Sequence, residues 1–128
     1  MSVEKTLVAA LLADSGIAAI TTRIYPNYIP QNAAYPLIVY QKVSGPRDHA
    51  LGGPTGKAHP RFQIEAWAET YDAAKRLAAA IRTALDGKRY TLGGTTISAL
   101  LQNEFDGYEE SEACHRIVSD FSIWHNET

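Results

Sequence analysis

Cys114 and His115 stand side by side, and a thiol next to an imidazole is a combination that enzymes use for nucleophilic catalysis. The same two side chains could in principle bind a metal ion. Adjacent residues of an extended strand cannot chelate one metal ion well, however, because their side chains point to opposite faces. The chain has four histidines and no second cysteine, and none of the histidines has the i, i+4 or paired-cysteine spacing of a metal site. We therefore expect no metal site.

Two other segments superficially resemble a nucleotide-binding motif and a pair of catalytic carboxylates. Residues 52–58 read GGPTGKA, but a phosphate-binding P-loop needs glycine where Leu51 stands and serine or threonine where Ala58 stands, and a helix must follow. Glu109 and Glu110 could act as general acid and base, yet they lie in a charge-rich segment typical of a solvated turn. No Gly-x-Ser-x-Gly turn is present. The sequence predicts a protein that is not an enzyme and has no cofactor.

Composition sets further limits. The chain has 128 residues, 45% hydrophobic and 20% charged, which predicts one globular domain over residues 1–128. A net charge of -2 argues against affinity based on contacts to phosphates. With a single cysteine no intramolecular disulfide can form, which suits a reducing compartment. The apolar run at residues 7–13 is too short to cross a bilayer and lacks the layout of a signal peptide, so we expect synthesis in the cytoplasm and no membrane partner.

Hydrophobic periodicity predicts six elements. Helical spacing of apolar residues predicts helices over residues 3–13 and 70–86, the second with Thr70 as N-cap and Gly87 as terminator. Alternating or β-branched runs predict strands over residues 37–43, 61–68, 95–102 and 116–125. We therefore predict an α+β fold with the order α-β-β-α-β-β. It is a two-layer sandwich of a mostly antiparallel four-stranded sheet with two main helices on one face.

Two connections between the predicted elements are long, and one predicted strand has a polar face that contains a tryptophan. Residues 21–36 contain three prolines and predict an irregular connection, and residues 44–60 form a 17-residue glycine- and proline-rich stretch that predicts a long loop. In the strand 61–68, Arg61 and Trp67 lie on the polar face. A tryptophan there indicates either a surface that meets a partner or a ring folded over the sheet edge.

Four segments together carry a resemblance to a known family. They are residues 23–26 (RIYP), 35–41 (YPLIVYQ), 62–68 (FQIEAWA) with 70–74 (TYDAA), and the last strand at 116–125. In this order and spacing they resemble the tail-completion, or tail-terminator, family of long-tailed bacteriophages, prophages and gene-transfer particles. Each motif consists mostly of core and turn residues, so the resemblance depends on their combination over most of the chain.

The resemblance implies a structural virion protein at the neck, assembled in the host cytoplasm. A tail-terminator subunit would form a ring, expected to be a hexamer, at the head-proximal end of the tail tube. The ring would stop tube growth and join the tail to the head-side connector or stopper protein. Its partners would be other copies of itself, the tail tube protein and that connector, while DNA would pass through the lumen without specific binding. The alternatives are another head–tail neck component and a small ligand-binding domain.

A ring needs two different patches of one subunit to meet, and two oppositely charged segments are candidates. The acidic segment, residues 104–112, contains Glu104, Asp106, Glu109, Glu110 and Glu112. The basic segment, the long loop with the start of the next strand, contains Arg47, Lys57 and Arg61 together with His49 and His59. We expect these segments, with Trp67, to form the subunit or partner interface. The acidic segment could instead line the lumen, where its charge would repel DNA, or both segments could simply be solvated.

Overall fold

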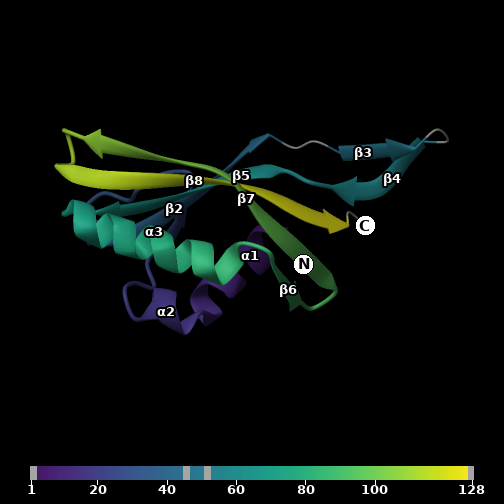
Figure 1. The fold of residues 1–128 in the computed structure, drawn as a ribbon, viewed down its shortest axis with the longest axis horizontal. Coiled ribbons are helices and arrows are strands. Elements are labelled where there is room, and N and C mark those ends of the chain that lie inside the picture. The colour runs from purple at the N-terminus through teal and green to yellow at the C-terminus, as the bar shows by residue number, and fades with distance from the viewer. Residues whose placement is uncertain (1–2, 45–46, 51–52, 127–128) are drawn as a thin grey trace.

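The computed structural model describes residues 3–44, 47–50 and 53–126, which form three helices and eight strands. The helices are α1 (Val3–Ala13), α2 (Ser15–Ala18) and α3 (Tyr71–Leu85). The strands are β1 (Ile24–Pro26), β2 (Leu37–Ser44), β3 (Arg47–Ala50), β4 (Gly53–Ala58), β5 (Arg61–Ala68), β6 (Lys88–Leu92), β7 (Thr95–Glu109) and β8 (Cys114–Asn126). Figure 1 shows the helices gathered on one side of a curled sheet. No helix of this described part is long and apolar enough to cross a membrane.

The two longer helices form where local sequence predicts them. Helix α1 has the predicted bounds, and Thr70 is the N-cap of α3, its hydroxyl accepting a hydrogen bond from the Ala73 amide at 3.2 Å. At the other end Gly87 has φ +72°, a conformation that residues with a Cβ rarely adopt. Between α1 and α3 lies a feature absent from the prediction, because Asp14 does not simply end α1 but also caps the short helix α2 through the Ile17 amide at 3.0 Å.

The sheet is mixed and centred on β8. One edge of β8 pairs with β5 and then, beyond Pro60, with β4, while its other edge pairs with β7; all of these pairings are antiparallel. Strand β5 continues to β2, and β2 pairs in parallel with β1. Strand β6 forms a hairpin with the start of β7, and β3 forms one with β4. The β3–β4 hairpin and the β7–β8 turn lie at opposite ends of the long axis (Figure 1).

The core lies between the helices and one face of the sheet. Side chains from the central strands, including Phe62, Ile64, Ile117 and Phe121, are fully buried against the apolar stripes of α1 and α3. The opposite face has a second, smaller apolar cluster made by Leu37, Val39, Trp67 and Cys114 under residues 25–35. Both faces of the sheet therefore contain buried residues.

The predicted fold class, a two-layer sandwich with a mostly antiparallel four-stranded sheet and two main helices, is wrong. The sheet has eight strands, contains a parallel pair and is curled. The error comes from segments that have little strand signal of their own: β1, β3, β4 and β6 are short and rich in glycine, proline or charge. They become strands because a neighbouring strand supplies hydrogen-bond partners, an effect that sequence periodicity does not report.

Two predicted loops are also strands. The predicted long loop at residues 44–60 contains the β3–β4 hairpin in its described part. The predicted acidic loop is largely the second half of β7, which continues to Glu109 instead of ending near residue 102. A register shift between Leu101 and Asn103 separates the two halves of this strand and reverses which alternate residues face the helices.

Candidate functional site

The acidic segment divides into a part that faces α3 and a part at the β7–β8 turn. Glu104 and Asp106 point toward α3, where Lys75 Nζ lies 3.8 Å from the first and 3.6 Å from the second. Arg82 Nη1 lies 3.8 Å from Glu104, and the Tyr71 hydroxyl donates to Asp106 at 2.7 Å. This hydrogen bond raises the pKa of Tyr71. These two carboxylates are therefore already neutralised within the subunit.

At the turn, three carboxylates differ in their contacts. Glu109 lies 3.1 Å from Arg116 Nε, and Glu112 accepts a 3.3 Å hydrogen bond from the Tyr35 hydroxyl. Burial, followed by the electrostatic interaction with the side chains of Cys114 and Glu112, raises the pKa of Tyr35 to about 12. Glu110 is exposed and forms no ion pair with another described residue. We call residues 109–112 the acidic tip.

Arg116 on β8 lies on the face of the sheet opposite the helices, between partners on β7 and on β5. A Cβ on Gly107 would lie 2.9 Å from Arg116 Nε, so the glycine leaves the space through which this side chain passes. Arg116 Nη1 also lies 3.8 Å from Glu65, a carboxylate that is only 9% exposed in its side chain. Gly107, Arg116 and Glu65 were not among the predicted site residues; the signal for them was the alternation of opposite charges on strands that face each other.

Trp67 lies inside the subunit, where 8% of it is exposed, and its Nε1 donates to Glu65 at 3.0 Å. The indole thus covers a buried carboxylate together with Arg116, whose guanidinium lies 5.9 Å from the ring centroid. The tryptophan that seemed suited to a partner surface has partners within its own chain.

Replacing Trp67 with phenylalanine is expected to lower the free energy of unfolding by about 1–2 kcal/mol, because Glu65 loses a buried hydrogen-bond donor. Urea unfolding of the variant measures this difference. The double variant Trp67→Phe/Glu65→Gln is the control, since it removes the buried charge along with its donor and should recover part of the loss. Equal stability of Trp67→Phe and the unmodified protein would contradict the assigned hydrogen bond.

The basic candidates occupy the other end of the sheet. Arg47 and Lys57 lie in β3 and β4, but their side chains fall outside the described part of the structure. Arg61 begins β5 and its Nη2 lies 3.1 Å from Asp120 Oδ2, with the arginine half exposed and the aspartate buried. The structure therefore does not bring the acidic and basic segments together within one subunit, because they lie at opposite ends of the long axis (Figure 1).

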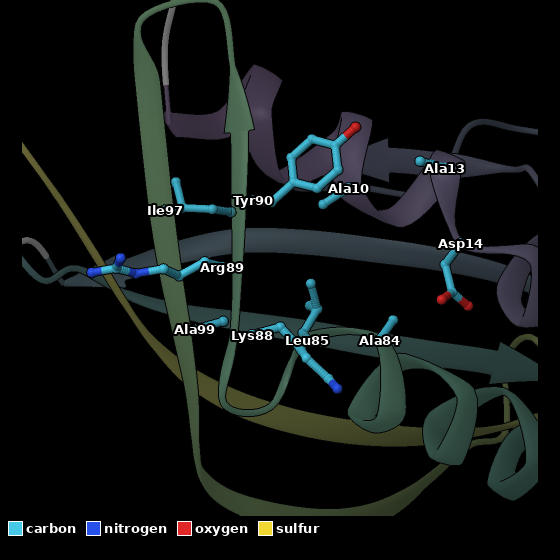
Figure 2. A pocket seen from close by; sticks show the side chains of 10 residues that line it. All are labelled: Ala10, Ala13, Asp14, Ala84, Leu85, Lys88, Arg89, Tyr90, Ile97 and Ala99. Carbon is cyan, nitrogen blue, oxygen red and sulfur yellow. The ribbon is translucent and has the colours of Figure 1, made fainter.

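A surface recess of about 180 Å³ bears on the ligand-binding alternative. It lies between α1, the end of α3 and the β6–β7 hairpin, and small side chains such as Ala10, Ala84 and Ala99 leave it open. Figure 2 shows that Arg89 points away from the recess, so that Asp14 and Lys88 are the charged side chains beside it. Asp14 is already used as the cap of α2. The recess thus offers few convergent polar groups to a ligand.

The residues considered for catalysis are packed within the fold or form part of a strand. Cys114 is buried, and burial raises the pKa of its thiol, which disfavours the nucleophilic thiolate. His115 packs edge-on against Tyr108 and Tyr71, at 4.8 and 5.6 Å between ring centroids. Among the described residues, no group of three or more histidine, cysteine or acidic side chains could hold a metal ion. The P-loop-like segment contributes β4.

Comparison with known families defines the class of this protein. The model of the family described as "Tail completion protein gp17" matches residues 5–126, nearly the whole chain. Its members are structural components of phage tails, and the predicted resemblance is thereby confirmed. The chain belongs to the tail completion protein gp17 family.

A solved structure has the same fold. A chain from the "Virion of native gene transfer agent (GTA) particle" superposes with a TM-score of 0.73 and is 21% identical. The match covers 98% of this chain and 95% of that chain. No curated protein matches the sequence.

Proposed function

We propose that this phage tail protein is a tail-terminator subunit. It forms a ring, expected to be six-fold, at the head-proximal end of the tail tube, contacts the tube protein on one side and the head-side connector on the other, and lets DNA pass through its lumen. The observation that carries the proposal is the polarity of the subunit: the acidic tip and the β3–β4 hairpin lie at opposite ends (Figure 1). A closed ring requires two such different patches on each subunit.

In this proposal the acidic tip of one subunit faces the basic end of its neighbour. The exposed Glu110 supplies negative charge without an ion pair to any described residue, and Arg47 and Lys57 in the neighbour's hairpin supply positive charge. Opposite potentials steer association and fix register more than they add affinity. The neutralised Glu104 and Asp106 contribute little net charge.

The mass and symmetry of the purified protein, alone and mixed with tail tubes, test the proposal. Light scattering gives the mass and negative-stain microscopy gives the symmetry. A six-membered ring, or density that caps one end of the tube, supports a terminator. A monomer that never binds tubes contradicts the proposal and points to another component of the neck.

Reversing the charge of the tip with Glu109→Lys and Glu110→Lys is expected to weaken assembly by about tenfold or more and to remove its salt dependence. The fraction of protein in rings is measured between low and high salt. The matched control for the single tip variant Glu110→Lys is Glu4→Lys, which makes the same change of charge on α1, away from the tip. Unchanged assembly with unchanged salt dependence in the tip variant would rule out the charged contact.

A further inference from the structure

The second half of β7 is an open strand edge. Over residues 95–99 this strand pairs with β6 on one side, and over residues 98–109 it pairs with β8 on the other. The amide of Leu101 is still satisfied on the β6 side, because it donates to Asp86 Oδ1 at 2.9 Å. Beyond that point, no backbone pairing of residues 102–109 on this side is made with any other described residue. The open edge is about 26 Å long at 3.3 Å per residue.

This edge has only some of the devices that usually keep open edges from pairing. Exposed edge strands are normally very short, carry charged side chains, lysine above all, or contain proline or a β-bulge. Residues 102–109 read QNEFDGYE, with no lysine or proline. Their three carboxylates lie near cations of the same subunit, namely Lys75, Arg82 and Arg116. The register shift near Leu101 lies at the start of the edge and leaves the rest in regular register with β8.

Aromatic side chains flank the edge on both faces of the sheet. Phe105 is 41% exposed and faces away from α3, opposite Val118 on β8. Tyr108 is 52% exposed and faces α3, where it packs on His115 beside Tyr71. A strand added along residues 102–109 would place its alternate side chains against these two rings, one on each face. Backbone hydrogen bonds would supply affinity and the two rings would supply register.

The same subunit carries a strand that could fill this position. Strand β3 is the outer strand of a hairpin at the opposite end of the molecule, and among the described strands it pairs only with β4 (Figure 1). By sequence the β3–β4 hairpin carries Arg47, Asp48 and Lys57, a net charge of +1, whereas the acidic tip, which contains no basic residue, follows directly on the β7 edge. The two open edges are therefore complementary in hydrogen bonding and in the charge beside them, and they belong to different ends of one chain.

We propose that β3 of one subunit pairs with the β7 edge of its neighbour, at residues 102–109, so that a continuous β-sheet between subunits closes the ring. The inference rests on the proposed ring function and states how its subunits are joined. Because each subunit donates a strand at one end and accepts one at the other, the contact is heterologous and can close by rotation. The charged contact at the tip then orients two subunits as they approach each other, and strand pairing holds them together.

Hydrogen exchange of the wild-type protein, as free subunit and as assembled ring or tube cap, tests this pairing directly. Backbone pairing is expected to slow amide exchange in peptides covering residues 102–109 and 47–50 by about tenfold or more. Residues 24–26 in the edge strand β1 serve as the internal control and should not change. Assembly without slower exchange at residues 102–109 would overturn strand pairing while leaving the ring function intact. Failure of any assembly would instead contradict the ring function.

Two variants identify the occupant of the edge. A protein whose residues 47–57 are replaced by a short glycine–serine turn is expected to keep the monomer fold by circular dichroism and to lose assembly. Phe105→Ala is expected to weaken assembly, whereas Leu100→Ala, at a similarly exposed position of the same strand but outside the edge, should not. Protection of residues 102–109 that appears with tail tubes even without the hairpin would show that the tube protein, not a second copy, fills the edge.

Discussion

Replacing Phe121 with alanine is expected to lower the free energy of unfolding by about 3–5 kcal/mol, because it deletes a fully buried ring and leaves a cavity. Phe121 lies at the centre of the sheet, paired with Phe62 on β5 and Leu101 on β7, beneath the helices. Since domains of this kind are stable by only about 5–15 kcal/mol, the variant should unfold at a much lower urea concentration.

The matched control is the same substitution at Phe105, which is 41% exposed on the helix-free face. Phe105→Ala should change stability by less than about 1 kcal/mol, because little of the ring is removed from a core. The two variants therefore separate folding from assembly: one loses stability, and the other loses ring formation. Similar urea midpoints for both would mean that Phe121 is not a core residue.

Replacing Arg61 with methionine is expected to destabilise the protein by about 2–3 kcal/mol, less than the roughly 3–5 kcal/mol for breaking a fully buried pair, because Arg61 is half exposed. Asp120 is 5% exposed in its side chain, and Arg61 supplies the hydrogen bond to its Oδ2 at 3.1 Å. The other oxygen, Oδ1, has no hydrogen-bond partner in the described structure. Loss of Arg61 would thus leave a buried carboxylate without its cation, and urea unfolding measures the difference.

Arg82→Met is the control for this prediction. Arg82 lies 3.8 Å from Glu104, and its side chain is 48% exposed, so its removal should cost less than about 1 kcal/mol. The double variant Arg61→Met/Asp120→Asn should recover part of the loss, since no buried charge remains. If Arg61→Met is no more destabilising than Arg82→Met, the Arg61–Asp120 contact is an ordinary surface pair.

The sequence by itself determined the elements whose signal is local. Helices α1 and α3 and strand β5 lie where periodicity and capping predict them, because apolar spacing and a side-chain cap act over a few residues. The order of core and turn motifs was also enough to recognise the family, which the match over residues 5–126 confirms. The opposite charges of residues 104–112 and of the segment around Arg47 could likewise be read directly.

Only the tertiary structure decided the extent of the sheet and the surroundings of the candidate site. Residues 104–109 are a strand because β8 supplies hydrogen bonds and α3 supplies cations for Glu104 and Asp106, and both partners are distant in sequence. Trp67 is buried because residues 25–35 pack over its face of the sheet. The parallel β1–β2 pair and the β3–β4 hairpin arise in the same way. Strand pairing and burial depend on contacts between remote segments, which a local pattern does not contain.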